Sequence, residues 1–176
     1  MIDKYGARRI GHGYRVVDDD ALMTECRDRG IHFEVCPTSS DETGGWMYDT
    51  RNWEDHPCLV MRRKDLSFSI SSDDPAVFHT SLAWQYRLAL VKMGMTREDI
   101  VQTNLNAVSA AFIDEDKKAR LRHAIEKYSL SSGVDDETSE NDVRHWHRSM
   151  SESFVDRTFA DRVFVKQENG LDTLYL

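Results

Sequence analysis

IHFEVCPTSS at residues 31–40 and LSFSISSDDP at residues 66–75 carry the clearest structural pattern in this chain. The first is a β-rich apolar run that stops at a proline. The second alternates apolar and polar residues before it reaches Asp-Asp-Pro, and both patterns are typical of strands. A third strand candidate, Ala7–Gly11, leads into Gly-His-Gly. The three runs end near residues 12, 36 and 72, a spacing that suits βα units of about 30 residues.

Helical patterns lie between and after the strand candidates. The expected helices run from Asp18–Asp20 to Arg29, from Pro57 to Lys64, from Ser81 to Met93, from a capping box at Thr96–Asp99 to Phe112, and from Asp114 to Tyr128. Two of them carry apolar stripes that we expect to face the core, namely Leu82, Tyr86, Leu90 and Met93, and then Leu121, Ala124, Ile125 and Tyr128. Strands that alternate with helices predict an α/β protein with a parallel sheet.

The composition narrows the class of protein. The chain has 176 residues, with 31 acidic against 23 basic side chains and a formal net charge of −8. Because negative charge repels phosphate backbones and anionic lipids, we expect no nucleic-acid partner and no membrane partner. The cysteines Cys26, Cys36 and Cys58 show no Cys-x-x-Cys spacing and indicate reduced thiols. We find no signal-peptide core and no long apolar run, which favours a cytoplasmic protein.

A change of composition near residue 128 predicts two regions. Residues 1–128 hold the strand and helix patterns. Residues 129–176 begin with the acidic run Asp135–Asp142, and we interpret them as a linker and an irregular acidic extension of unknown role. The length also argues against a complete eight-stranded α/β barrel, which typically needs about 250 residues.

Polar residues follow the strand candidates at the points where ligands bind in α/β proteins. His12 lies between two glycines, which let a ligand or a metal approach closely, although a structural histidine would show the same pattern. The side chains of Asp73 and Asp74, which follow the third strand, are expected to point in opposite directions and can therefore have different functions. The alternative is an Asx turn before Pro75, with both carboxylates in water.

An ordered series of motifs runs through residues 8–128. It consists of RIGHGY (9–14), HFEVCP (32–37), Ser39-Ser40 with Thr43-Gly44 and Trp46, SISSDDP (69–75), and Asn104 with Asn106-Ala107. This series resembles the carboxyl-terminal half of the adenosine deaminases, a family of the metal-dependent hydrolase superfamily. The GHG and TGGW segments resemble the adenosine enzymes more closely than the adenine deaminases.

The resemblance implies the last three or so βα units of a (β/α)8 barrel and a zinc-dependent hydrolytic deamination of adenosine or deoxyadenosine. By match to the family motifs, His12 would be a general base or electrostatic stabiliser beside the attacking hydroxide. Asp73 would be a Zn²⁺ ligand, and Asp74 would hydrogen-bond to purine N7 or share a proton with it. Gly11 and Gly13 would keep the floor of the substrate pocket open.

The chain departs from the family pattern in its metal ligands. In the family, three zinc-binding histidines and a catalytic glutamate come from motifs that have no counterpart in this sequence. Asp73 is therefore the single zinc ligand that the resemblance assigns to this chain. His145-Trp146-His147 has the His-x-His spacing, but its polar surroundings favour solvent-exposed histidines. We therefore expect these 176 residues alone to have no deaminase activity.

Two alternatives stay open. The chain could be a non-catalytic barrel remnant that self-associates or binds a partner, because an opened barrel exposes sheet edges and an apolar inner face. It could also come from a deaminase of AMP or N6-modified nucleotides, with Arg15 as the candidate phosphate ligand. We expect Cys36 to pack in the barrel wall, and we see no His or Asp partner for Ser39 and Ser40.

Overall fold

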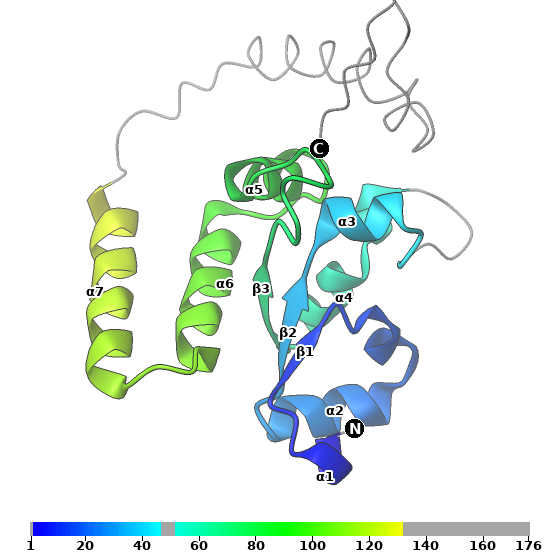
Figure 1. The fold of residues 1–176 in the computed structure, drawn as a ribbon, viewed down its shortest axis with the longest axis horizontal. Helices are drawn as coiled ribbons and strands as arrows, with labels where there is room; N and C mark the ends of the chain where they lie inside the picture. The colour runs from blue at the N-terminus through cyan, green and yellow to red at the C-terminus, as the bar shows by residue number, and fades with distance from the viewer. Residues whose placement is uncertain (1, 47–51, 132–176) are drawn as a thin grey trace, which may run out of the picture. The chain divides into compact units, whose positions relative to one another are not determined.

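A three-stranded parallel sheet forms the centre of the protein. The computed structural model describes residues 2–46 and 52–131, all within the compact unit Met1–Gly133. Strands β1 (Arg9–Gly11), β2 (His32–Val35) and β3 (Ser67–Ile70) pair in the order β1-β2-β3 (Figure 1). Both pairings are parallel, so the three strands expected from the sequence and their mutual orientation are confirmed.

Helices connect and follow the strands. In chain order they are α1 (Ile2–Tyr5), the 3-10 helix η1 (Tyr14–Asp18), α2 (Asp20–Asp28), α3 (Pro37–Glu42), the 3-10 helix η2 (Trp53–Asp55), α4 (Pro57–Arg63), α5 (Leu82–Val91), α6 (Arg97–Ala110) and α7 (Glu115–Ser131). The five helices expected from the sequence are present. The short elements α1, η1, α3 and η2 were not predicted, because each is too short to show a helical period.

Local capping explains where the longer helices begin. The Asp19 carboxylate accepts hydrogen bonds from the backbone N–H groups of Ala21 and Leu22 and so starts α2. Thr96 and Asp99 form a reciprocal capping box at the start of α6, as their spacing predicts. Asp99 also forms an ion pair with Arg62 from the last turn of α4, which joins the two helices.

The two faces of the sheet differ in polarity. Ile10, Phe33 and Phe68 lie side by side in the pairing register, and this apolar face packs into the core with residues of α2 and α4. On the opposite face, Arg9 of β1 and Glu34 of β2 form an ion pair. Alternation along the strands thus places charged side chains on this face, where an apolar inner face was expected, and the Arg9 guanidinium donates to the backbone carbonyl of Ala110 at the end of α6 at 3.4 Å.

The core stripe expected on α5 is confirmed only in part, because Met93 is buried and Tyr86 packs against the core but the two leucines do not. Leu82 is 43% exposed and Leu90 is 36% exposed, whereas Gln85, Leu88 and Ala89 are buried. The Gln85 amide sets this orientation because it donates to the hydroxyls of Thr38 and Thr80, both at 2.7 Å.

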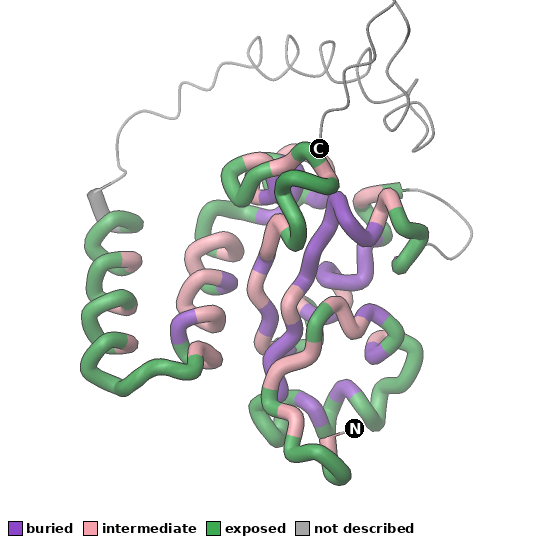
Figure 2. The backbone as a smooth tube through the Cα atoms, viewed as in Figure 1, coloured by how far each residue is buried: buried purple, intermediate pink, exposed green. Residues whose placement is uncertain are grey.

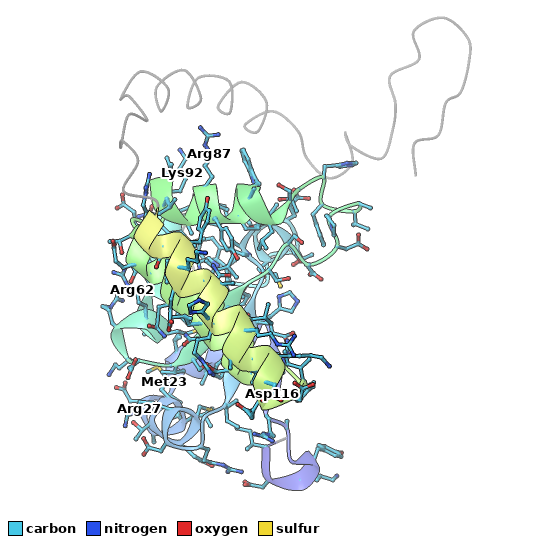
Figure 3. All side chains as sticks on the ribbon, turned by 90° about the vertical axis from the view of Figure 1, so that its left-hand side faces the viewer. Met23, Arg27, Arg62, Arg87, Lys92 and Asp116 are labelled. Atoms are coloured by element: carbon cyan, nitrogen blue, oxygen red, sulfur yellow. The ribbon has the colours of Figure 1, made fainter. Side chains whose placement is uncertain are left out.

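The stripe expected on α7 is not a core face within the described residues. Leu121 is 47% exposed and Tyr128 is 75% exposed, and Figure 2 shows most of α7 as exposed surface. The helix packs beside α6, which itself lies against β3 (Figures 1 and 3).

Two expectations lie wholly or mostly outside the described residues. The region predicted over 129–176 is described only to Ser131, where α7 ends, and His145-Trp146-His147 falls beyond it. Within residues 2–46 and 52–131, every helix is too short or too polar to cross a lipid bilayer.

Candidate metal and catalytic site

Each strand of the sheet delivers one candidate metal ligand to its carboxyl end. His12 follows β1, Cys36 follows β2 and Asp73 lies beyond the end of β3. One potential ligand atom from each of these three residues lies within 4.8 Å of the other two. Among the described residues, they form the one group of His, Cys, Asp or Glu side chains that lie close enough together to hold a metal ion. His12 Nε2 is 3.6 Å from Asp73 Oδ2. The structure therefore brings together His12 and Asp73, as the position of both at strand ends suggested.

His12 and Asp73 both have a left-handed backbone conformation. Strands β1 and β3 are separated by β2, so their axes lie about 9.5 Å apart. His12 adopts φ = 57° and Asp73 adopts φ = 60°, and each turn redirects its side chain at the end of the strand. Such conformations cost L-residues free energy, and they persist where the surrounding contacts impose them. Asp65 and His79 share the conformation in other turns, so it does not by itself mark a site.

A hydrogen-bonded chain orients the His12 ring. Ser40 Oγ donates to the Tyr14 hydroxyl at 2.8 Å and lies 3.1 Å from His12 Nδ1. The Ser40 hydroxyl thus links the phenol of Tyr14 to the imidazole of His12. The Cys36 N–H donates to the same Tyr14 oxygen at 2.9 Å and holds the phenol in place. This network holds the ring so that its other nitrogen, Nε2, faces the Asp73 carboxylate.

The Asp73 carboxylate has its own support. Ser39 Oγ donates to Asp73 Oδ2 at 2.6 Å, and the Asp73 N–H donates to Ser71 Oγ at 3.2 Å. The expectation that Ser39 and Ser40 lack a His or Asp partner is therefore wrong. Both serines lie in the first turn of α3, and that helix could not be recognised from its six residues.

Asp74 has a different structural role from Asp73. Its Oδ1 accepts hydrogen bonds from the N–H groups of Ala76 and Val77, at 3.1 and 3.2 Å, so it caps the turn after Pro75. This is the Asx-type turn that the sequence offered as the alternative. The side chain is exposed, and its role toward a substrate stays a prediction.

The two glycines beside His12 differ in what they permit. A Cβ atom on Gly11 would meet no atom within 4 Å, whereas one on Gly13 would lie 2.7 Å from Phe33 Cδ1. Gly13 also has φ = 67°, a conformation that favours glycine. Gly13 is thus required by the packing beneath the site, while Gly11 leaves open space at the end of β1.

Cys36 lies beside the candidate site, a position that the sequence did not indicate. It is buried, as expected for a wall position, but its sulfur also lies in the cluster with His12 and Asp73. Burial, followed by the negative charge of Asp73, raises the pKa of the Cys36 thiol to about 11. Its position directly before Pro37, at the end of a predicted strand, was the available signal.

The donor set of the cluster fits zinc. Imidazole nitrogen, thiolate sulfur and carboxylate oxygen are the three ligand types that Zn²⁺ accepts, at bond lengths of about 2.0–2.3 Å. Ligand atoms around a tetrahedral ion with those bonds lie about 3.3–3.6 Å from one another. The 3.6 Å between His12 Nε2 and Asp73 Oδ2 meets this requirement. The three ligand atoms all lie within 4.8 Å of one another, so any pair at that upper limit would have to move about 1 Å closer to bind one ion.

Two further histidines are structural. His32 is buried with Ser67 Oγ 2.9 Å from Nδ1 and Ser69 Oγ 3.0 Å from Nε2, and burial lowers its pKa to about 4. His56 accepts the Cys58 N–H at 3.3 Å and so caps α4. Burial lowers the pKa of His56 to about 3, so both rings are neutral at physiological pH.

Parallel βα units with candidate metal ligands at their carboxyl edge are typical of the metal-dependent hydrolase fold of the barrel class. The family model described as adenosine deaminase matches residues 1–128, and the chain belongs to that family.

Known proteins support this assignment. The chain is similar to adenosine deaminase from Bos taurus, with 35% identity over 132 residues, which cover 74% of this chain and 35% of the bovine protein. An amidohydrolase from Burkhoderia ambifaria, solved with bound zinc, is 31% identical with a TM-score of 0.65 and is matched over 72% of this chain and 35% of its own. Adenine deaminase from Arthrobacter aurescens has a TM-score of 0.68 at 21% identity, over 73% of this chain and 38% of that one, and shows the shared fold. The chain thus spans about a third of the length of these relatives.

Proposed function

We propose that this chain forms one side of the active site of a zinc-dependent deaminase that hydrolyses adenosine or deoxyadenosine to inosine or deoxyinosine and ammonia. The observation that carries the proposal is the 3.6 Å approach of His12 Nε2 to Asp73 Oδ2 at the carboxyl edge of a parallel sheet. Membership of the adenosine deaminase family supports the reaction class.

The side chains of the site take distinct roles. Asp73 would hold the ion, and the Ser39 hydroxyl would fix the orientation of its carboxylate. A bound zinc ion would supply Lewis acidity that lowers the pKa of a water molecule. His12 Nε2, which lies 3.6 Å from Asp73 Oδ2, would accept a proton beside that carboxylate, and Ser40 would hold the ring from the Nδ1 side.

Substrate binding would use the surroundings of these two residues. Gly11 leaves space at the end of β1 in which a purine ring can approach the site. Asp74 would hydrogen-bond to purine N7 by sharing a proton with it. Its Oδ2 atom would do this, since Oδ1 already caps the following turn.

Site-directed substitution in a longer protein that contains this chain tests the proposal. His12→Ala and Asp73→Ala should each abolish the conversion of adenosine to inosine, followed by the fall in ultraviolet absorbance. His123→Ala and Asp116→Ala, which alter exposed positions on α7, are matched controls that should retain full turnover. Near-normal turnover in either site variant would refute the assigned roles.

The 176-residue chain by itself should show no turnover, because Asp73 is its one zinc ligand by family resemblance. Zinc-dependent formation of inosine by the purified chain would contradict this expectation. If the longer protein also lacks activity while the chain binds a partner or self-associates, the alternative of a non-catalytic module would be correct.

The 5′-phosphate alternative is less well supported. Arg15, its candidate phosphate ligand, forms an ion pair with Asp18 at 2.6 Å from η1. A phosphate would have to compete with that carboxylate. Comparing adenosine with AMP as substrates of the longer protein decides between the two.

A further inference from the structure

We infer that Gln85 of α5 is a positioning residue. It joins the first turn of α3 to the end of the β3–α5 loop (residues 71–81), and it thereby holds Ser39 and Asp73 in contact with each other. The inference rests on the proposed function in one respect, namely that Asp73 holds the metal ion. Neither the sequence pattern nor the resemblance to the family assigns Gln85 to the site.

The Gln85 side chain is fully buried and bridges two threonines that lie far apart in the sequence. Its Oε1 atom accepts a hydrogen bond from the backbone N–H of Thr38 at 3.2 Å. Because a backbone N–H can only donate, this contact fixes which end of the amide is the oxygen. The Nε2 atom then donates to Thr38 Oγ1 and to Thr80 Oγ1, both at 2.7 Å. Both ends of the amide are thus hydrogen-bonded, one segment of the chain on each side.

Each of these threonines belongs to a segment that carries a residue of the candidate site. Thr38 directly precedes Ser39 in the first turn of α3. Thr80 lies near the end of the β3–α5 loop, which also contains Asp73. The Ser39 hydroxyl donates to Asp73 Oδ2 at 2.6 Å, so α3 and the loop meet at the site as well as at Gln85. Helices α3 and α5 both lie at the carboxyl end of the strands (Figure 1), where this double connection is made.

The β3–α5 loop contains backbone conformations that need support from outside it. Asp73 has φ = 60° and His79 has φ = 44°. Such left-handed conformations are unfavourable for L-residues and persist where the surrounding contacts impose them. Ser39 supports the loop at Asp73, and Gln85 supports it at Thr80. Loss of the Gln85 contacts should therefore loosen the loop and change the position of the Asp73 carboxylate.

The affinity for a metal ion depends on how firmly its ligands are oriented. Removing a group that orients a metal ligand from behind typically weakens metal binding or activity by about 10–100-fold. Ser39 touches the Asp73 carboxylate directly, whereas Gln85 acts one step further away, through Thr38 and Thr80. We therefore expect an effect near the lower end of that range, about tenfold.

Two substitutions at Gln85 separate its hydrogen bonds from its packing. Gln85→Met keeps a similar length and volume but has no group that can bond to the threonines. Gln85→Glu can keep all three contacts, because the Thr38 N–H still donates and both threonine hydroxyls can rotate to donate to the carboxylate. Thr103→Val is the matched control, since it removes a buried hydroxyl whose hydrogen bond, to the Ile100 carbonyl, lies within α6.

The first measurement is amide hydrogen exchange of the purified 176-residue chain. The N–H groups of Phe78 and Thr80 donate to carbonyls within the β3–α5 loop, and that of Met23 donates within α2. In Gln85→Met, we expect the two loop amides to exchange at least about tenfold faster relative to the Met23 amide. Gln85→Glu and Thr103→Val should keep the wild-type ratio.

The second measurement is the zinc affinity of a longer protein that contains this chain, determined by competition with a chelator. Each variant is first shown to be folded by circular dichroism. Gln85→Met should bind zinc at least about tenfold more weakly than the wild type, while Gln85→Glu and Thr103→Val should bind it as the wild type does. A residue with a purely structural role would change the free energy of unfolding but leave the zinc affinity of the folded protein unchanged.

Three outcomes would overturn the inference. They are an unchanged zinc affinity in Gln85→Met, an equal loss of affinity in Thr103→Val, and loop amides that exchange no faster in Gln85→Met than in the wild type. If Gln85→Met does not fold, Thr80→Val decides, because it keeps the shape of threonine and removes one of the three contacts. It should still speed exchange in the loop and weaken zinc binding, and the absence of either effect would refute the role of Gln85.

The failure of this inference and that of the proposed function are distinguishable, because neither measurement involves turnover. If Gln85→Met binds zinc normally and the wild-type longer protein deaminates adenosine, only the role of Gln85 is wrong. If the wild-type longer protein binds zinc but does not deaminate adenosine, the proposed reaction is wrong, and the Gln85 variants are still decided by their zinc affinity. A wild-type longer protein that binds no zinc would overturn both.

Discussion

Replacement of Gly13 by alanine tests how the chain turns at the end of β1. Two costs apply to the new methyl group. The backbone at Gly13 has φ = 67°, and an L-residue in this left-handed region costs about 1–2 kcal/mol. The Cβ atom would also lie 2.7 Å from Phe33 Cδ1 and 3.0 Å from Ile10 Cγ2, and overpacking of this kind costs about 1–3 kcal/mol.

The sum predicts that Gly13→Ala lowers the free energy of unfolding by about 2–5 kcal/mol. This is a large part of the 5–15 kcal/mol that stabilises an ordinary domain. Two other glycines separate the contributions. Gly30 has φ = 64° and open space around its Cα, so Gly30→Ala should lose only the backbone part, about 1–2 kcal/mol.

Gly11→Ala is the third member of the series. Gly11 lies outside the left-handed region and has no atom within 4 Å of an added Cβ. Its substitution should therefore change stability by less than about 1 kcal/mol, in the stabilising direction if the unfolded chain loses entropy.

The assay is urea unfolding of the three variants and the wild-type chain, monitored by circular dichroism, with the midpoint and slope compared. The expected order of destabilisation is Gly13→Ala, then Gly30→Ala, then Gly11→Ala. If Gly13→Ala cost no more than Gly30→Ala, the close approach of Phe33 to the turn would be wrong. A double-mutant cycle with Phe33→Leu should recover part of the difference, because it removes the ring edge that the methyl group meets.

Two further predictions concern stability. Thr96→Ala removes half of the capping box of α6 and should lower the free energy of unfolding by about 1 kcal/mol in urea, whereas Ser109→Ala on the exposed side of the same helix should have little effect. Because burial lowers the pKa of His32 from 6.5 to about 4, the unfolded state binds a proton that the folded state does not between these values. The stabilising contribution of neutral His32 should therefore be fully present above pH 6.5 and fall by about 2 kcal/mol on acidification to pH 5, and buried His56 should add a similar fall. His32→Gln should reduce this pH dependence, while His123→Gln, at an exposed position, should preserve it; an unchanged pH dependence in His32→Gln would show that His32 is charged or exposed.

The strands and most helix starts were predictable because their causes are local. Alternating residues at 66–71, the proline at 37 and the capping residue Thr96 act within a few positions of the chain. The direction in which α5 faces the core was not predictable. It depends on Gln85 binding Thr38, which is 47 positions away in the sequence.

Some residues of the candidate site could likewise be predicted from the sequence, and others could not. His12 and Asp73 could be selected from the sequence because each follows a recognisable strand, and ligand sites lie at the carboxyl ends of parallel strands. Cys36, Ser39 and Ser40 were interpreted as wall or loop residues. Their partners come from strands on either side, so their roles emerge once the sheet register is known.

By itself, the sequence determined the parallel α/β class, the strand ends that carry His12 and Asp73, and the resemblance to one part of a deaminase barrel. The tertiary structure decided that both residues converge above β2, that Cys36 joins them, and that the face of the sheet away from the core is polar. The physical reason is that strand pairing, left-handed turns and hydrogen bonds between distant residues fix side-chain positions to within a few ångströms. Local patterns specify where an element lies along the chain, and only its packing specifies what its side chains meet.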